Sequence, residues 1–356
     1  MTRLKLPMTL FSLFINQIEA LWTLSHTLHS SLYAGAKAVK GVFLDFSSPF
    51  NTISRSRILS QLCEDGVEGW LINWLQNYFS NRLQHVRVAN EASSSLPNNC
   101  GVLQGAVQSP FLFNCYTSSL RSPNEVTLIK YSDDLTVCHA WKTDGDSQLL
   151  GQAVTEVLEW SSENGPLLNA SKCIYITFSL TAAVDTPEIP SLHNFAPSSK
   201  SKFLGVIFNS RLSWSDHVDA VFGKCRRLCF LVRRFRRLGL SSSYIKKFVH
   251  ACIIHIIVYC SPIIFPGLKC SEFLTLIDFF KIILFSSCLP ILFIQEIIVQ
   301  RHFNNYSRIA ARILSDPSHP LYPSLSECKS LRPMRRLYRS ISTRTATYYS
   351  LFVPDI

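Results

Sequence analysis

The sequence has few charged residues, and acidic residues are the scarcer kind. Charged residues make up 17% of the 356 residues, against 47% hydrophobic residues. So much apolar side chain can bury a core, which excludes a disordered chain. Asp and Glu number 24 against 35 Lys and Arg, and the formal net charge is +11. This balance favours a polynucleotide or an anionic lipid surface as partner, although a solvated basic surface has the same composition.

The 12 cysteines include no Cys-x-x-Cys pair and no Cys/His cluster at zinc spacing. That absence argues against a structural zinc site and against a disulfide framework. Cys225 and Cys229 lie one helical turn apart, but no second pair follows. We expect reduced thiols packed in a core, in an intracellular compartment, the nucleus or the cytoplasm.

Long uncharged apolar runs are missing too. Residues 10–15 are apolar, but no clear cleavage site follows, so we expect the start of a helix that reaches Leu28 and no signal peptide. Residues 282–295 lack charged side chains, yet Pro290 interrupts them and a membrane span needs about 20 residues. We expect a buried helix there, with membrane association through residues 250–300 as the weaker alternative.

The apolar pattern predicts a mixed sheet with helices on one face, an α+β fold, within the first 210 residues. Residues 38–46 read as a buried strand, followed by a helix that begins near Pro49, is capped by Ser47 or Ser48 and ends at Gly66. A second helix has apolar residues at spacings of three and four: Trp70, Leu71, Trp74, Leu75 and Tyr78.

Later segments complete this sheet. Residues 126–131 and 135–138 read as a hairpin around a tight Ser132–Asp133 turn. An amphipathic helix over 149–158 follows, and then two strands at 172–178 and 203–208. From about Trp214 onward the pattern is helical, which marks a domain boundary.

Three carboxylates stand in otherwise apolar surroundings. Asp133 and Asp134 lie side by side in the hairpin turn, and Asp45 lies near the end of the first strand. An apolar strand disfavours a carboxylate unless something compensates it, and Mg²⁺, with its preference for hard oxygen ligands, is one compensator. If the hairpin lies beside the first strand, the three could hold two metal ions about 4 Å apart. Taken alone, an Asp-Asp pair is more often an ordinary turn.

Five short strings in a fixed order resemble the motifs of reverse transcriptases. They are residues 42–53 (VFLDFSSPFNTI, motif A), 101–113 (GVLQGAVQSPFLF, motif B), 131–134 (YSDD, motif C), 168–173 (LNASKC, motif D) and 203–206 (FLGV, motif E). Each string is weak, but the ordered set is specific. The variant most resembled is the enzyme of non-LTR (LINE) retrotransposons, and residues 312–321 (RILSDPSHPL) look like the C-terminal region of chicken-repeat and Jockey-like elements.

The resemblance implies a right-hand polymerase palm and an RNA-directed DNA polymerase, a nucleotidyltransferase. Its partners would be an RNA template, a DNA primer and deoxynucleoside triphosphates. Asp45, Asp133 and Asp134 would be catalytic and bind two Mg²⁺ ions, with Mn²⁺ as the alternative. The implied nucleotide-binding residues are Phe46, Phe50, Gln104, Gly105 and Lys172.

Two of these residues have equally credible structural explanations. Phe50 would be the ring that excludes a 2′-hydroxyl, or a core residue at a helix start. Lys172 would lie near the leaving pyrophosphate and could neutralise it or donate a proton, or be a solvated lysine at a strand end.

A basic helix follows the motifs. Its residues Lys224, Arg226, Arg227, Arg233, Arg234, Arg236 and Arg237 are interleaved with apolar ones. This pattern predicts one apolar and one basic side. A helix of this kind could lie on an anionic membrane. Its position after the motifs favours a thumb that grips the duplex backbone with salt-dependent affinity, beside a primer-grip hairpin containing Gly205.

The sequence departs from the family pattern in places. Pro49 stands where motif A normally has Ala, and Leu103 stands where motif B usually has Pro. Few residues precede Asp45, which leaves the usual fingers motifs no room. We therefore expect a truncated element copy with impaired polymerase activity; the alternative is a catalytically inactive nucleic-acid-binding remnant. The expected division is 1–37, a helical remnant of the fingers; 38–210, the palm; 211–268, a helical thumb-like region; and 269–356, an apolar and then basic C-terminal region.

Overall fold

The computed structural model describes residues 17–120, 126–143, 146–165, 168–181, 189, 192, 194–268, 272, 275, 282, 304, 307–308, 311–315 and 322. Apart from Ile282, the expected buried helix over 282–295 lies outside these residues, as does most of the string 312–321. The chain divides into two compact units. Unit 1 comprises Met1–Ala20, Ala36–Thr177 and Val184–Ser198, and unit 2 comprises Leu21–Gly35, Phe178–Ala183 and Ser199–Ile356.

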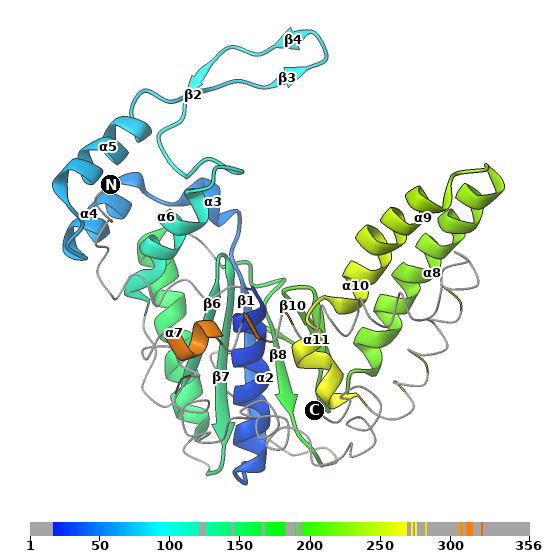
Figure 1. The fold of residues 1–356 in the computed structure, drawn as a ribbon. Helices are drawn as coiled ribbons and strands as arrows, with labels where there is room; N and C mark the ends of the chain where they lie inside the picture. The colour runs from blue at the N-terminus through cyan, green and yellow to red at the C-terminus, as the bar shows by residue number, and fades with distance from the viewer. Residues whose placement is uncertain are drawn as a thin grey trace. The chain divides into compact units, whose positions relative to one another are not determined.

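Unit 1 is built around a five-stranded mixed sheet in the order β6-β7-β1-β8-β9 (Figure 1). Strand β1 (Ala38–Asp45) lies at its centre and pairs antiparallel with β7 (Asp134–Trp141). Strand β7 continues the hairpin from β6 (Thr127–Tyr131), and β8 (Ile174–Phe178) pairs parallel with β9 (Ala196–Pro197). The strands expected at 38–46 and 172–178 and the hairpin around Ser132 are confirmed. An apolar run buried on both faces is typical of a central strand such as β1.

The helix expected after β1 is two helices. Helix α3 (Pro49–Thr52) ends where Ile53 turns extended, and α4 (Arg55–Glu64) begins after Ser54. Pro49 fits the first turn of α3, where a missing N–H costs nothing. The expected cap is wrong. Ser48, before α3, has a left-handed backbone conformation and makes no capping hydrogen bond with its side chain. At the start of α4, the Ser54 hydroxyl accepts a hydrogen bond from the Arg57 N–H.

Helix α5 (Gly69–Phe79) is present as expected, but the face it buries differs. Its buried side chains are Ile72, Leu75 and Phe79, whereas Trp70 and Trp74 are exposed. The helix therefore has two apolar stripes, and spacing alone could not tell which of them meets the core.

An arm of four short strands follows α5 (Figure 1). Strand β2 (Leu83–Gln84) pairs with β5 (Leu96–Pro97), and β3 (Arg87–Val88) pairs with β4 (Glu91–Ala92). All of these strand residues are exposed.

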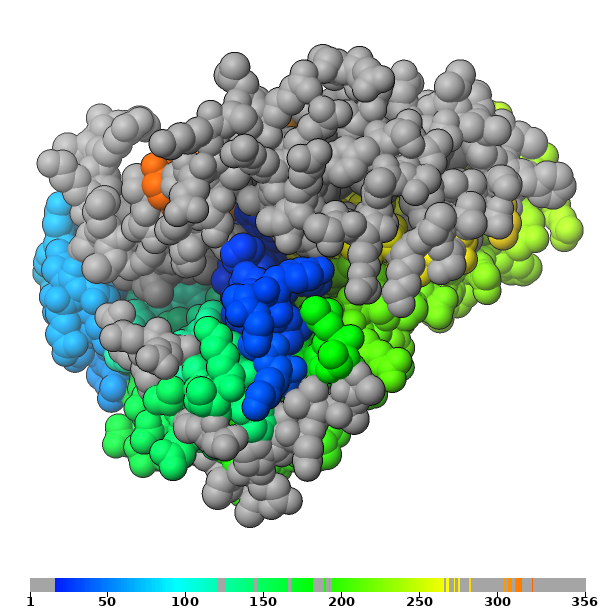
Figure 2. Space-filling model, turned by 90° about the horizontal axis from the view of Figure 1, so that it is seen from below, coloured from blue at the N-terminus to red at the C-terminus, as the bar shows by residue number. Residues whose placement is uncertain are grey.

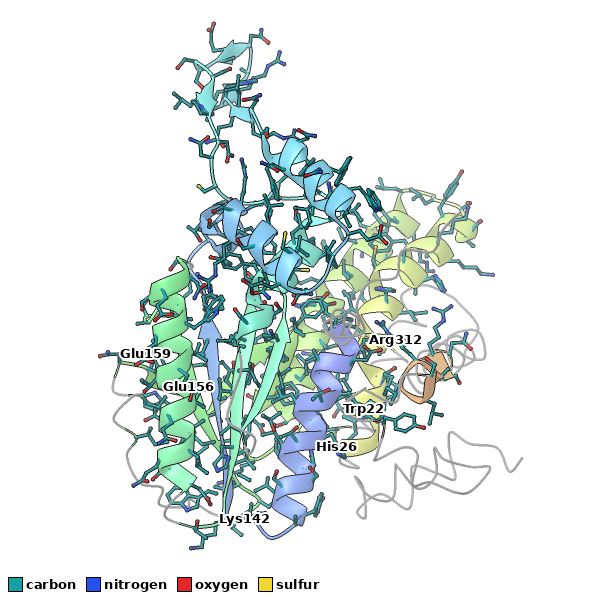
Figure 3. All side chains as sticks on the ribbon, turned by 90° about the vertical axis from the view of Figure 1, so that its left-hand side faces the viewer. Trp22, His26, Lys142, Glu156, Glu159 and Arg312 are labelled. Carbon is teal, nitrogen blue, oxygen red and sulfur yellow. The ribbon has the colours of Figure 1, made fainter. Side chains whose placement is uncertain are left out.

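Two helices complete the core of unit 1. Helix α6 (Ser109–Tyr116) continues into a 3-10 turn (Thr117–Ser119), and α7 (Asp146–Asn164) packs on β7. Trp160 meets the ring of Tyr116 edge-on at 6.0 Å. Glu156 and Glu159 lie on the exposed side of α7 and point away from the sheet (Figure 3).

Unit 2 contains most of α2 (Gln17–Tyr33). Part of this helix is exposed at the surface and is coloured blue in Figure 2. The single strand expected at 203–208 is a hairpin of β10 (Lys200–Phe203) and β11 (Val206–Asn209). Its turn falls at Leu204 and Gly205, both with positive φ. Residues 203–208 contain no polar side chain, so the apolar run continues through the turn and concealed it.

The rest of the described unit 2 is helical, as expected. Its elements are α8 (Ser215–Arg237), α9 (Ser242–Phe248), a π-helical turn (Val249–Ile254), α10 (His255–Val258), α11 (Ser261–Ile264) and a 3-10 turn (Phe265–Gly267). Cys225 and Cys229 lie on the buried side of α8, and the described cysteines of both units are free thiols. The expected packing of thiols in a core is confirmed for Cys225 and Cys229.

Candidate active site

The strand register brings two of the three carboxylates together. Asp45, the last residue of β1, lies directly opposite Asp134, the first residue of β7. Directly opposed residues of an antiparallel pair project to the same face of a sheet, with Cβ atoms about 5 Å apart. Asp133 precedes Asp134 in the β6–β7 turn, where Ser132 takes a left-handed φ of 54°. All three carboxylates therefore lie at one end of the sheet.

The charges of this cluster act on one another. The pKa of Asp134 is raised to about 6, first by burial and then by the negative charges of Asp133 and Asp45. Lys172 Nζ lies 3.4 Å from Asp45 Oδ2, an oxygen without a hydrogen-bond partner. One cation of the chain thus partly offsets three anions.

The loop that carries Lys172 is attached to the end of β1. Phe46 and Leu168 form an isolated antiparallel bridge, and the Asn169 N–H donates to the Asp45 carbonyl oxygen at 2.8 Å. The Asp45 N–H in turn donates to Cys173 Sγ at 3.4 Å. These bonds fix the string 168–173 against the strand end and keep the ammonium group beside the carboxylate.

Backbone hydrogen bonds join the string 101–113 to the segment after β1. The Gly101 N–H donates to the Ile53 carbonyl and the Val102 N–H to the Phe50 carbonyl, each at 2.8 Å. Gly101 has a φ of 74°, and an added Cβ would stand 2.6 Å from the Phe50 carbonyl oxygen. Only glycine fits this close approach.

The expected nucleotide-binding residues are partly brought together. Phe50 is half-buried and packs on Phe113 with ring centroids 5.0 Å apart, so it is partly the core residue of the alternative explanation. Gln104 is exposed, and its Nε2 donates to Asn51 Oδ1 at 3.3 Å. Gly105 is exposed with a φ of 86°. The Phe46 side chain is buried, which leaves only its backbone for a nucleotide.

Sequence reasoning missed one buried residue, Arg55. Its guanidinium donates to the carbonyl oxygens of Gly101 at 2.8 Å, Phe79 at 3.1 Å and Cys100 at 3.0 Å, and to Asn98 Oδ1 at 2.8 Å. It thereby holds the chain leading into Gln104. The available signal was a cation placed between two apolar residues, Ile53 and Ile58.

The carboxylates do not form a ready-made cage for a metal ion. Among residues that the structure describes, no three His, Cys, Asp or Glu side chains are arranged to hold one ion. The expected convergence is therefore only partial, because like charges resist close approach and Asp45 pairs with Lys172. The opposed oxygens of Asp45 and Asp134 nevertheless suit Mg²⁺, which commonly takes one or two carboxylates together with substrate phosphates.

In unit 2 the basic residues of α8 lie where the pattern predicted. Lys224 and all six arginines of the predicted set are exposed, and the opposite face, including Phe222 and Val232, is buried. Gly205 lies in the β10–β11 turn with a φ of 86°. Behind this turn, the Tyr259 hydroxyl donates to the Leu204 carbonyl at 2.7 Å. A Cβ at Gly205 would meet the Tyr259 ring at 3.2 Å.

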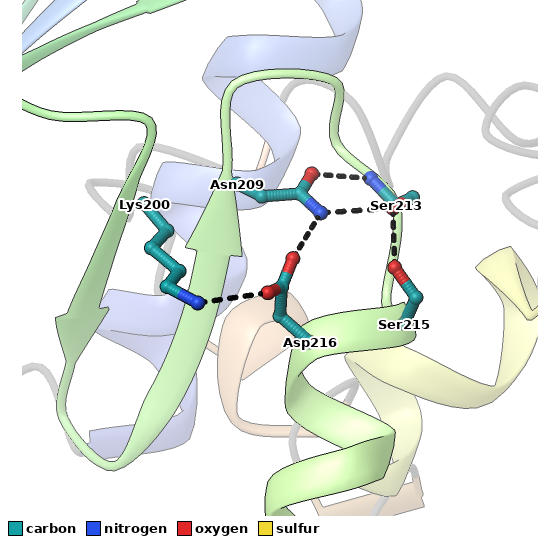
Figure 4. Close-up of polar contacts among 5 residues, drawn as sticks. All are labelled: Lys200, Asn209, Ser213, Ser215 and Asp216. Carbon is teal, nitrogen blue, oxygen red and sulfur yellow. Dashed lines mark hydrogen bonds and ion pairs between the residues drawn. The ribbon is translucent and has the colours of Figure 1, made fainter.

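A polar network joins that hairpin to the start of α8 (Figure 4). The Asp216 carboxylate accepts from Lys200 Nζ at 3.1 Å and from Asn209 Nδ2 at 2.8 Å. Asn209 Oδ1 accepts from the Ser213 N–H at 2.8 Å. The hydrogen bond from Asn209, followed by that from Lys200, lowers the pKa of Asp216. Nothing in the sequence pattern singled out this contact.

One helical stretch in the described chain is long and apolar enough to cross a membrane. It is Ser242–Ile264, with a mean hydropathy of 1.7, and 56% of its apolar window is buried inside the protein. Core helices pass the same test, so this stretch is weak evidence for a membrane. It differs from the residues 282–295 that the apolar pattern singled out.

Comparison with known proteins gives consistent matches. Residues 8–208 match the family described as reverse transcriptase (RNA-dependent DNA polymerase). A probable RNA-directed DNA polymerase from transposon BS of Drosophila melanogaster is 25% identical over 196 residues, 52% of this chain and 21% of that protein. The RNA-directed DNA polymerase from mobile element jockey of Drosophila funebris is 24% identical over 245 residues, which are 64% of this chain and 25% of that protein. The chain thus spans a quarter or less of these relatives.

Among solved structures, apo telomerase from Candida tropicalis is similar with a TM-score of 0.48 and 10% identity, over 85% of this chain and 52% of that one. A form of that telomerase truncated from its C-terminal domain is similar with a TM-score of 0.43 and 12% identity, over 56% of this chain and 40% of that one.

The family match covers more than half of this chain and includes all three carboxylates, both sides of the strand pair and the Gly101 segment. The chain therefore belongs to the reverse transcriptase (RNA-dependent DNA polymerase) family.

Proposed function

We propose that this chain carries the polymerase centre of a non-LTR retrotransposon reverse transcriptase, which adds deoxynucleotides to a primer 3′-hydroxyl opposite an RNA template. The observation that carries the proposal is the register of β1 and β7, which sets Asp45 opposite Asp134 with Asp133 in the adjoining turn. A carboxylate such as Asp134, whose pKa is raised by desolvation and by the neighbouring charges of Asp133 and Asp45, is typical of a site that works with a cation.

We assign Asp45 and Asp134, with Asp133 beside them, to holding the divalent cations. Two bound Mg²⁺ ions would activate the attacking hydroxyl and neutralise charge on the phosphates of the nucleotide. The chain's own part is to hold acidic oxygens accessible at the strand ends. The ammonium of Lys172, 3.4 Å from Asp45, is suitably placed to transfer from that carboxylate to a triphosphate.

We assign recognition of the nucleotide to the segments that meet at Gly101. The Phe50 ring is braced by Phe113, so it would resist displacement by a ribose 2′-hydroxyl. The exposed residues Gln104 and Gly105 would face the base pair being formed. In this proposal residues 38–210 are the palm and 1–37 a helical part of the fingers. Residues 211–268 are the thumb-like region, with primer-side contacts at Gly205, and 269–356 are the C-terminal region.

Primer extension on poly(rA)/oligo(dT) with Mg²⁺ tests the proposal. Asp134→Asn and Asp45→Asn each remove an anionic oxygen with little change in shape, so we expect incorporation to fall by at least about 100-fold in either variant. Asp146→Asn, outside the cluster, serves as the control. Incorporation that survives either substitution in the cluster would refute the metal assignment.

A second candidate is nucleic-acid binding without catalysis. It is favoured by the pairing of Asp45 with Lys172 and by the exposed cations of α8. It predicts salt-sensitive binding of RNA or of a hybrid duplex that Asp134→Asn leaves unchanged, with no incorporation by the wild-type chain. Incorporation by the wild-type chain would eliminate this candidate.

A further inference from the structure

An aromatic stripe runs along a second side of α5, which is exposed at Trp70 and Trp74 and partly buried against the core at Tyr78. Trp70, Trp74 and Tyr78 recur every four residues, so they lie on one face of the helix. The rings of Trp74 and Tyr78 are stacked, with centroids 5.7 Å apart and an angle of 11° between their planes. The Arg82 guanidinium lies over the Tyr78 ring at 4.5 Å, and its Nε donates to the Tyr78 carbonyl. Below, these four residues are called the aromatic stripe.

The aromatic stripe is not needed to bury the helix. Ile72, Leu75 and Phe79 anchor α5 in the core of unit 1. Trp70 and Trp74 remain 56% and 51% exposed, whereas the other described tryptophans, Trp22, Trp141, Trp160 and Trp214, are buried. Two large rings left in water need a reason, since burying such a ring is favourable.

The charge around the aromatic stripe suits a polyanion. Residues 69–90 include no Asp or Glu, but they include Arg82 and Arg87. Arg82 stands at the end of the stack, and the exposed arm with Arg87 follows it directly. The nearest acidic residues, Glu68 and Glu91, lie just outside this range, and Glu68 accepts a hydrogen bond from the Trp70 indole.

We propose that the aromatic stripe binds single-stranded RNA, namely template that has not yet been copied. This rests on the proposed function. Exposed rings combined with arginine are the usual platform for unpaired bases, because every base presents a flat face to stack on. In a hybrid duplex those faces are already stacked on their neighbours, so the aromatic stripe discriminates in favour of the single strand. The contact is independent of sequence, as a template platform must be.

Fluorescence anisotropy with the full chain tests this proposal. The probes are a labelled single-stranded RNA and the same RNA annealed to its full DNA complement, in buffer without divalent cations. We expect Trp74→Ala and Trp70→Ala each to weaken single-strand binding roughly tenfold, with duplex binding unchanged. Trp74→Phe, which keeps a ring, retains most of the affinity. Tyr33→Ala removes a ring that is 52% exposed on α2 and serves as the matched control without effect.

Several results would overturn the proposal. One is a wild-type chain that does not bind single-stranded RNA; another is equal affinity in Trp74→Ala and the wild type. If Trp74→Ala lost the same affinity for the single strand and for the duplex, the ring would not discriminate between them, and the proposed preference for the single strand would be refuted. Unchanged RNA binding with self-association lost in Trp74→Ala, measured by sedimentation, would make the aromatic stripe a protein interface. Thermal melting of Trp70→Ala and Trp74→Ala near the wild-type temperature is expected, because neither ring is in the core.

Failure here is distinguishable from failure of the proposed polymerase. Asp134→Asn leaves single-strand binding at the wild-type level if the aromatic stripe acts alone. Incorporation that depends on Asp134 but binding that ignores Trp74 refutes only the aromatic stripe. Binding that depends on Trp74 without any incorporation refutes only the polymerase.

Discussion

At the scale of single residues, the candidate site depends on a few close contacts. Gly101 touches the backbone near Phe50, and Arg55 satisfies the carbonyl groups that lead up to it. Buried carbonyls without a donor are costly, and a guanidinium provides several donors in a fixed plane. The short segment before Gln104 thus takes its conformation from a residue outside the motif.

Replacing Arg55 by Met should lower the free energy of unfolding by about 3 kcal/mol, because several buried oxygens lose their donor. Denaturant unfolding followed by circular dichroism measures the loss. Arg57→Met, two positions along α4 and exposed, is the matched control and should change stability by less than about 0.5 kcal/mol. Equal midpoints for the two variants would show that the guanidinium contributes nothing.

At the scale of elements, the β10–β11 hairpin and α8 of unit 2 are joined by buried polar contacts. His217 in the first turns of α8 accepts, through Nδ1, a hydrogen bond from the Ile207 N–H at 3.3 Å. Burial, and then the charge of Lys224, lowers the pKa of His217 to about 4. The ring is therefore neutral in the folded protein at neutral pH.

This shift predicts stability that depends on pH. A histidine whose pKa is about 4 when folded and 6.5 when unfolded contributes fully above pH 6.5, and its contribution is lost as the pH falls towards 4. The loss amounts to up to about 3 kcal/mol. In the variant His217→Gln, the melting temperature should fall less between pH 7 and pH 4.5 than in the wild type. In the control His85→Gln, which replaces an exposed histidine, it should fall as much as in the wild type. An unchanged decline in the first variant would contradict the assignment.

At the scale of the whole molecule, the net charge is +11, and part of the excess of cations lies along one helix. The exposed side of α8 carries Lys224 and six arginines, and its other side is apolar and buried. A surface of this kind binds phosphates without reading sequence, and its affinity falls steeply with salt because counterions are released. The proposed polymerase and the proposed binding remnant both require it.

The salt dependence of duplex binding measures this contribution. Arg233→Gln with Arg237→Gln removes two cations one helical turn apart and should reduce the slope of log affinity against log salt by about 2. The matched double variant Arg57→Gln with Lys142→Gln removes two exposed cations outside α8 and should leave the slope unchanged. Equal slopes for the two double variants would exclude α8 as the binding surface.

Much of the fold followed from the sequence by itself. The strand at 38–46, the hairpin around Ser132 and the two-sided helix with Cys225 and Cys229 were predicted correctly. A short continuous apolar run indicates a strand buried on both faces, and apolar residues every three or four positions indicate a helix with one buried side. The ordered motifs likewise identified the family. Patterns of this kind are local, so they survive in a single sequence without any structure.

Tertiary structure alone decided the remaining features. Only the register of β1 and β7 could set Asp45 opposite Asp134, and only packing could choose Ile72 over Trp74 as the buried face of α5. The contacts of Arg55 join segments more than twenty residues apart, which no local pattern encodes. Strand register and packing depend on which distant surfaces fit one another, and that fit is a property of the folded chain.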